Sequence, residues 1–302
     1  MADLIITKFH YLQASLLYKS NNILAEGPYW HQSRRSFFWV DIDGKKFHEY
    51  KWENGEVAEW LMDFRVSLVA ETEHNDKILL AVQGGLIAFD LSTGEFEWLV
   101  DIEKHKPMNR TNDGGCDPMG RLLIGTMHRE FETGAGALYS IEHDLSLKKR
   151  LDNVSISNGI VWSEDGSKVY YIDSPTKTVQ SFFYDIKTGD LQFEKVAIRI
   201  TEGSPDGMCM DTEGMLWIAQ WDAFGVYRYN PETGEQLGKI ELPVPQVSSC
   251  AFGGDNLDYL FITTARENMP ADVLEKYPLS GNVFIAKPGV KGLPVHKFGK
   301  RK

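Results

Sequence analysis

Short apolar runs of strand length recur along the whole chain, and each follows a turn that contains glycine, asparagine or aspartate. Examples are FFWVD at 37–41, LLIGT at 122–126, VYYID at 169–173 and MLWIA at 215–219. Aromatic and β-branched residues dominate these runs, which are too short for amphipathic helices. Almost no helical periodicity separates them. The pattern therefore predicts an all-β chain.

One glycine turn recurs in the sequence and marks a hairpin. It reads STGE at 92–95, KTGD at 187–190 and ETGE at 232–235, with a looser copy, ENGE, at 53–56. Each copy follows a short alternating segment, and its glycine supplies the positive φ that a tight hairpin needs. A second class of turn, such as EDG at 164–166, comes earlier in each unit and precedes an apolar run. Each unit therefore holds two hairpins and about four strands.

The residue just before the first strand of each unit marks a repeat of about 41 to 48 positions, so six units fit the chain. Four short strands per unit predict a six-bladed β-propeller, with four-stranded antiparallel blades around a central channel, as a single domain over 1–302. A pair of β-sandwiches is the alternative, but a sandwich does not require near-equal units. The aligned residues are Glu26, Ser67, Asn112, Asn158, Asp206 and Ser248.

The ends of the ring and two long loops complete this prediction. An N-terminal strand within 13–19 is expected to pair with the last unit, because an open ring would leave an unpaired sheet edge. The stretches 128–136 and 265–280 are longer than the repeat requires. Long loops on a rigid scaffold often carry function, and the first of these loops could place Glu130 over the mouth of the ring.

Composition and charge exclude several classes of partner. The 302 residues are 42% hydrophobic and 25% charged, as in a globular protein with a substantial core. A net charge of -11 would repel nucleic acid, and the only basic run is the short tail 300–302. Three cysteines far apart in sequence favour a reducing compartment. Without a signal peptide or an apolar run of membrane length, we expect a cytoplasmic protein with no membrane partner.

The six aligned residues should converge on one mouth of the channel, because the innermost strand of each blade begins there. Glu26 and Asp206 bring carboxylates, Asn112 and Asn158 bring carboxamides, and no lysine is close in sequence to balance them. One divalent cation would resolve this, and oxygen ligands favour calcium, magnesium or manganese, whereas zinc usually brings histidine or cysteine. The ion's identity stays open among these four metals. The alternative is that these are ordinary turn residues.

Other catalytic patterns are missing from the sequence. It has no Gly-x-Ser-x-Gly elbow, no P-loop, no His-Glu-x-x-His and no dinucleotide fingerprint. Arg110 is different, because it stands two positions before Asn112 and could offer a fork of donors to a carbonyl or hydroxyl group. A surface salt bridge explains its spacing equally well.

Six motifs, in order along nearly the whole chain, resemble the senescence-marker-protein/gluconolactonase/luciferin-regenerating-enzyme family. The motifs are EGP at 26–28, NRTNDG at 109–114, SNG at 157–159, YYIDS at 170–174, PDGM at 205–208 and AFGG at 251–254.

The resemblance implies roles for individual residues. Glu26, Asn158 and Asp206 would bind the metal, and Arg110, Asn112 and Glu130 would contact a sugar lactone. Asp113 would support Asn112 without touching the ion. Glu132 is a rival to Glu130, because the loop after 125–127 is shorter here than in regucalcin-like members of the family.

The resemblance implies hydrolysis of an aldono-1,4- or 1,5-lactone, such as gluconolactone or a pentonolactone, to the aldonic acid, and the chemistry of the residues agrees with the mechanism. The metal would polarise the lactone carbonyl, and Asp206 would take a proton from the attacking water. Such an enzyme is a carboxylic ester hydrolase of the EC 3.1.1 type, and it needs no protein partner. The alternatives are a hydrolase of another ester, such as a phosphotriester, and a non-catalytic metal-binding propeller.

Overall fold

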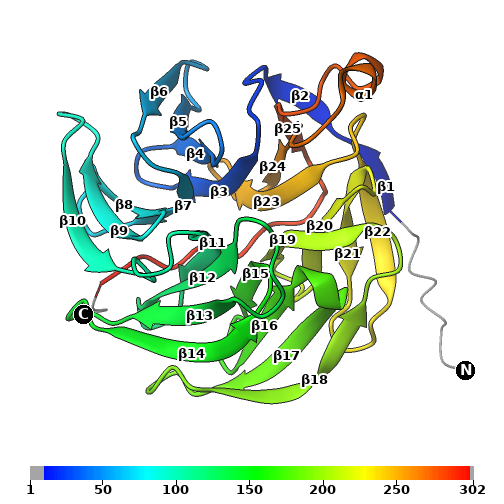
Figure 1. Ribbon diagram of the computed structural model, residues 1–302. Coiled ribbons are helices and arrows are strands. Elements are labelled where there is room, and N and C mark those ends of the chain that lie inside the picture. The colour runs from blue at the N-terminus through cyan, green and yellow to red at the C-terminus, as the bar shows by residue number, and fades with distance from the viewer. Residues whose placement is uncertain (1–9, 300–302) are drawn as a thin grey trace, which may run out of the picture.

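The chain folds into six β-sheets that stand around a central axis like the blades of a propeller (Figure 1). This computed structural model describes residues 10–299, so the basic run at 300–302 lies outside the described residues. The fold confirms the predicted six-bladed propeller with antiparallel four-stranded blades. In the described part of the chain, no helix is long and apolar enough to cross a membrane.

In each blade the strands follow one another from the channel outward. The first three blades are β3 (Ala25–His31), β4 (Ser36–Asp41), β5 (Lys46–Lys51) and β6 (Val57–Leu61); β7 (Val66–Glu71), β8 (Lys77–Val82), β9 (Gly85–Asp90) and β10 (Phe96–Asp101); and β11 (Asn109–Cys116), β12 (Leu122–His128), β13 (Gly136–Ile141) and β14 (Leu147–Val154). The next two are β15 (Ser157–Trp162), β16 (Lys168–Asp173), β17 (Thr178–Tyr184) and β18 (Leu191–Arg199); and β19 (Ser204–Met210), β20 (Leu216–Trp221), β21 (Gly225–Tyr229) and β22 (Gln236–Glu241).

The last blade takes strands from both ends of the chain. It contains β23 (Val247–Gly253), β24 (Tyr259–Thr264), β25 (Val283–Ala286) and, at its outer edge, β2 (Ser15–Tyr18), which pairs antiparallel with β25. The preceding strand β1 (His10–Gln13) adds to the outer edge of the fifth blade, parallel to β22. The N-terminal segment therefore covers two sheet edges that would otherwise be open. The helices are one turn of 3-10 helix, η1 (Ser174–Thr176), and α1 (Ala271–Lys276) in the long loop of the last blade.

The glycine turns adopt the backbone that the sequence predicts. Gly94, Gly189 and Gly234 have φ values of 75°, and Gly55 has 73°, so all four lie in the left-handed region that favours glycine. Each joins the third and fourth strands of its blade. These turns lie on the outside of the ring and leave its inner strands free to build a site.

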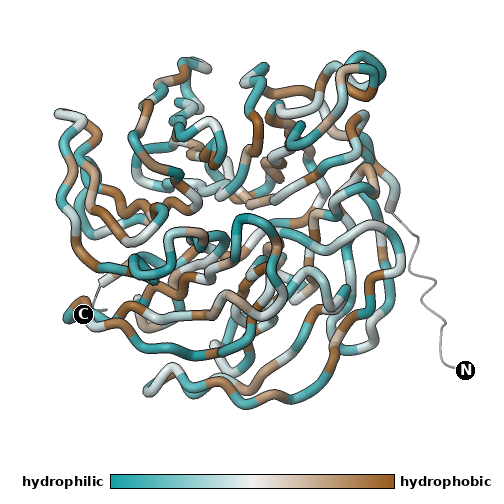
Figure 2. Tube along the Cα trace, viewed as in Figure 1, coloured by the Kyte–Doolittle hydropathy of each residue, from teal (hydrophilic) through white to brown (hydrophobic). Residues whose placement is uncertain are grey.

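Apolar side chains fill the spaces between neighbouring blades. Trp30 of the first blade stacks on Phe261 of the last with ring centroids 5.7 Å apart, and Phe37 lies 4.3 Å from the same ring. Hydrophilic residues concentrate in the turns and along outer strands such as β14 (Figure 2). Six apolar clusters, each shared by two neighbouring blades, thus hold the inner strands in fixed positions.

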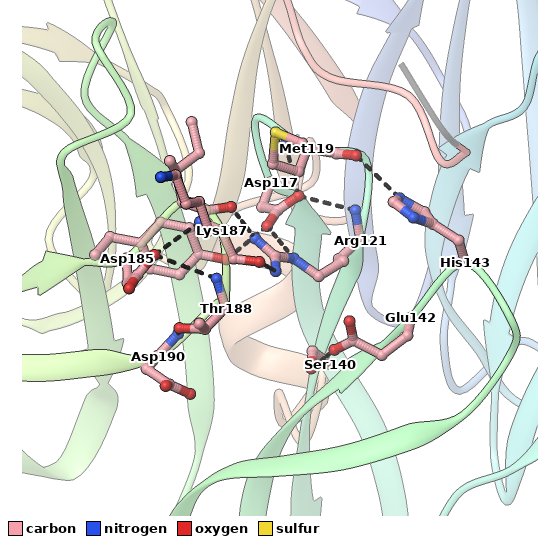
Figure 3. A network of polar contacts seen from close by, with 12 residues as sticks. Asp117, Met119, Arg121, Ser140, Glu142, His143, Asp185, Lys187, Thr188 and Asp190 are labelled. Atoms are coloured by element: carbon pink, nitrogen blue, oxygen red, sulfur yellow. Dashed lines mark hydrogen bonds and ion pairs between the residues drawn. The ribbon is translucent and has the colours of Figure 1, made fainter. Parts of the chain in front are cut away.

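A buried ion pair joins the third blade to the fourth. Asp117 is fully buried, and its carboxylate accepts hydrogen bonds from Arg121 Nε and from Tyr184 Oη, both at 2.6 Å. The guanidinium also donates to the carbonyls of Ile186 (2.6 Å) and Lys187 (3.0 Å) in the hairpin of the next blade. Figure 3 shows Arg121 lying between Asp117 and this hairpin. One side chain therefore neutralises a buried charge and satisfies two carbonyl groups across a blade boundary.

Replacing Arg121 with alanine is expected to lower the free energy of unfolding by about 3 kcal/mol, because the Asp117 carboxylate would stay buried without its counter-ion. Denaturant unfolding of the variant and the wild type measures the difference. Arg35→Ala is the matched control, since Arg35 pairs with Asp255 on the surface, where its side chain is 48% exposed. Equal unfolding midpoints for the two variants would show that the buried pair does not stabilise the ring.

Candidate metal centre and active site

Every innermost strand carries a β-bulge near the residue that the sequence repeat marks. Pairing with the second strand shifts register between Glu26 and Tyr29 in the first blade, and an equivalent shift occurs in the other five. A bulge turns the local side chains away from the regular alternation of a strand. The other shifts lie between Val66 and Leu68, Thr111 and Gly114, Asn158 and Ile160, Pro205 and Met208, and Val247 and Ser249.

The six marked residues are all buried, but they divide into two groups. Two serines tie neighbouring blades together: Ser67 donates to Thr111 Oγ1 at 2.8 Å, and Ser248 donates to the Ala25 carbonyl at 2.6 Å. The other four line one cavity of about 320 Å³, together with Arg110. They are Glu26, Asn112, Asn158 and Asp206. The bulges thus bring residues from four blades to a single cavity.

A chain of hydrogen bonds fixes the carboxamides in this cavity. Arg110 donates to Asn112 Oδ1, and Asn112 Nδ2 donates to Asn158 Oδ1 at 3.0 Å. Asn158 Nδ2 then donates to Ser174 Oγ at 2.8 Å, and the Ser174 hydroxyl donates to the Pro205 carbonyl at 2.7 Å. Each amide nitrogen has an acceptor, so the Asn158 oxygen is held on the cavity side as a possible ligand atom.

Ser174 is a residue to which the sequence interpretation assigned no role, although it belongs to the motif YYIDS at 170–174. We expect Ser174→Ala to free the Asn158 amide to rotate and to weaken divalent-metal binding about 10- to 100-fold. Calorimetric titration with calcium and manganese measures the change. Ser167→Ala, at an exposed serine of the same blade, is the control. Unchanged metal affinity in Ser174→Ala would show that Ser174 does not orient Asn158 for metal binding.

Burial, together with repulsion between neighbouring carboxylates, keeps the acidic groups in and beside this cavity from ionising normally without a cation. Burial, and then the nearby Asp113 carboxylate, raise the pKa of Glu26 to about 8, although the Gly27 N–H and Arg110 oppose this shift. Burial, and then Glu26 and Asp113, raise the pKa of Asp206 well above its ordinary value, with Arg110 again opposing. Burial raises the pKa of Asp113 to about 6. The structure therefore holds more negative charge here than one guanidinium balances.

This donor set fits a hard divalent cation. Such ions prefer carboxylate and amide oxygens, and Glu26, Asp206 and Asn158 supply three of them from three blades. Among residues 10–299, no three histidine, cysteine, aspartate or glutamate side chains gather into a metal-binding group. A metal in this cavity would therefore depend on the Asn158 carboxamide as well as on the two carboxylates.

Metal binding at this site is expected to strengthen as pH rises. Glu26 has a pKa of about 8 in the protein without metal, so below that pH the incoming cation must displace a proton. Affinity should rise about tenfold or more for each pH unit between 6 and 8, because the pKa of Asp206 is raised as well and the cation must displace its proton too. Titration calorimetry at pH 6, 7 and 8, in buffers of different ionisation enthalpy, gives both the affinity and the protons released. A pH-independent affinity with no proton release would contradict this assignment.

The acids of the loop 128–136 and Asp113, which the sequence also suggested for the site, do not line this cavity. Glu130 and Glu132 are exposed and do not line the cavity, whereas Phe131 between them does. Asp113 accepts a hydrogen bond from its neighbour Gly114 at 2.7 Å and lines a second cavity of about 370 Å³ in the channel. Glu267, in the loop of 265–280, lines the first cavity. Its loop is longer than the repeat requires, but nothing in the sequence singles out this acid.

Comparison with known proteins gives consistent matches. A family model described as the SMP-30/Gluconolactonase/LRE-like region matches residues 24–266. Regucalcin from Oryctolagus cuniculus is 37% identical over 281 residues, which cover 90% of this chain and 94% of that protein. A calcium-binding protein, regucalcin, from Agrobacterium tumefaciens has a TM-score of 0.90 at 29% identity, covering 98% of this chain and 99% of that chain. The structure of a luciferin-regenerating enzyme has a TM-score of 0.87 at 29% identity, and the match covers 92% of this chain and 96% of that chain.

Proposed function

The chain belongs to the SMP-30/gluconolactonase/LRE-like family, and from this premise we propose that it hydrolyses a sugar lactone to the aldonic acid with the help of one divalent cation. The observation that carries the proposal is the cavity shared by two buried carboxylates, two carboxamides and an arginine. The substrate would be an aldono-1,4- or 1,5-lactone. The cytoplasmic location stays a prediction.

Glu26, Asn158 and Asp206 would hold the cation, which when bound supplies positive charge to polarise the ester carbonyl. The rest of the chemistry belongs to side chains. Asp206 would accept the proton of the attacking water. Arg110 and Asn112 would orient the lactone, because both line the cavity and neither is needed as a metal ligand.

The cavity matches a small cyclic ester in size and polarity. Its volume of about 320 Å³ lies at the lower end of the range for small-molecule sites. Because the ester is cyclic, the acid and the alcohol stay on one product, so a single cavity serves the whole reaction. An arginine and a carboxamide beside the metal ligands suit a substrate that carries several hydroxyl groups.

The test is acid release from gluconolactone and xylonolactone after the protein has been stripped of metal with a chelator. Activity should disappear on chelation and return with one divalent ion out of calcium, magnesium, manganese and zinc. Calcium is the first ion to try, because the Agrobacterium relative is described as calcium-binding. Full activity in the stripped protein would contradict the metal assignment. Faster hydrolysis of a phosphotriester than of any lactone would favour the alternative function, a hydrolase of another ester.

A further inference from the structure

One acid at the cavity has no place in the metal centre. Glu267 lies in the turn that follows β24 and lines the cavity beside Asn268. Gln246 holds this turn through two hydrogen bonds: Ala265 N donates to the Gln246 carbonyl at 2.9 Å, and the side-chain Gln246 Nε2 donates to the Glu267 carbonyl at 3.0 Å. The turn is therefore a fixed part of the wall, and it places the Glu267 side chain at the cavity.

Acids and bases both act on the Glu267 carboxyl group. Burial, and then the nearby Asp43 carboxylate, raise the pKa of Glu267, whereas Arg110 and Arg65 lower it. Arg65 Nε donates to Asp43 Oδ1 at 2.6 Å, so Asp43 already has a strong partner. Glu267 makes no ion pair among the described residues, but its carboxyl group shares a hydrogen bond with the Asp43 side chain. Asp43 engages one carboxyl oxygen of Glu267, and the other oxygen can bind hydroxyl groups of a ligand that also reaches Arg110.

We propose that Glu267 is the acidic side chain that binds the ring hydroxyls of the substrate, and that it thereby sets the preference for a polyhydroxylated lactone. This inference rests on the proposed function. A carboxyl group can accept hydrogen bonds from two neighbouring hydroxyls of a sugar, which an apolar ester does not offer. Arg110 and Asn112 would bind the same ring from other blades.

Position decides between Glu267 and the acids of the other long loop. Glu267 is partly buried and lines the cavity, whereas Glu130 and Glu132 are exposed and do not. The loop of 128–136 instead presents Phe131, and Trp221 lies on the cavity wall as well. An aromatic ring packs against the C–H face of a sugar and leaves its hydroxyls to point towards polar groups. The cavity thus has apolar surfaces for the ring and one unassigned acid for the hydroxyls.

The experiment compares Glu267→Ala, Glu130→Ala and the wild type on gluconolactone and on unsubstituted butyrolactone, with metal content measured for each protein. Glu275→Ala is the matched control, since Glu275 is exposed on α1 in the same loop and lines no part of the cavity. Glu267→Ala should lose about 10- to 100-fold in kcat/KM on gluconolactone, with butyrolactone hydrolysis and metal content unchanged. Glu267→Gln should recover part of the loss, because an amide still accepts one hydrogen bond.

Three results would overturn the proposal: full gluconolactone activity in Glu267→Ala, an equal loss on both lactones, or a selective loss in Glu130→Ala alone. Titration of the metal-loaded proteins with glucose, which carries ring hydroxyls and no ester, separates this inference from the proposed function. If the wild type hydrolyses no lactone, the proposed function fails. Weaker glucose binding by Glu267→Ala would then still support the hydroxyl site, and no glucose binding by the wild type would reject it.

Discussion

Asp206→Asn is expected to bind divalent metal at least about a hundredfold more weakly than the wild type and to lose nearly all lactone hydrolysis. The substitution keeps the size of the side chain and removes one of the two carboxylates assigned to the ion. It also removes the group proposed to accept the proton of the attacking water. Glu26→Gln removes the other carboxylate, so its metal affinity should fall similarly.

The stability of the metal-free proteins separates this effect from misfolding. Burial and neighbouring acids raise the pKa of Asp206 in the folded state, so at neutral pH, where the unfolded chain ionises this group freely, Asp206 destabilises the folded wild type. Metal-free Asp206→Asn should therefore unfold at the same or a higher temperature than metal-free wild type. Added metal should raise the unfolding temperature of the wild type and leave that of the variant unchanged.

Asp222→Asn is the matched control, because Asp222 lies in an exposed turn of the same blade with a φ of 63°, which asparagine also tolerates. It should keep both metal binding and activity. Metal analysis and lactone assays on the three proteins decide the assignment. Full metal occupancy together with full activity in Asp206→Asn would remove this residue from the site.

The shared cavity of Glu26, Asn112, Asn158 and Asp206 could be predicted because the repeat carries spatial information. One repeat along the chain is one step around the ring, so residues at equivalent positions lie on neighbouring inner strands. The hydrogen bond between Asn112 and Asn158, 46 positions apart, follows this rule. So does the 3.7 Å contact between the Cys209 and Cys250 sulfur atoms, although these thiols are far apart in sequence.

Features that break the repeat were beyond this kind of prediction. Ser174 lies after the second strand of its blade and reaches Asn158 only because a single turn of 3-10 helix begins there. Glu267 belongs to the connection between the second and third strands, whose length differs from blade to blade, so the repeat alone does not fix where this side chain lies. The same limit applies to 128–136, where sequence favoured Glu130 although Phe131 is the residue that lines the cavity.

The preference for ring hydroxyls is expected to be large. A lactone such as gluconolactone or xylonolactone can add hydrogen bonds to Arg110, Asn112 and the acid on the cavity wall beyond those that Arg110 and Asn112 make within the protein, whereas unsubstituted butyrolactone has no hydroxyl groups to offer. Each such hydrogen bond that is not formed costs about 1 to 3 kcal/mol. Two or three such hydrogen bonds imply a preference of about a hundredfold or more in kcat/KM.

The measurement is kcat/KM for gluconolactone, xylonolactone, butyrolactone and a phosphotriester under one metal ion at one pH. Arg110→Ala tests whether this arginine contributes to the preference. The variant should show a smaller ratio of kcat/KM for gluconolactone over butyrolactone, while its metal content stays normal. A loss that appeared equally for every ester would place Arg110 in the reaction itself, because the carbonyl is common to both lactones. Equal wild-type rates for gluconolactone and butyrolactone would reject a sugar lactone as the substrate, since nothing in the cavity would then be recognising the hydroxyls.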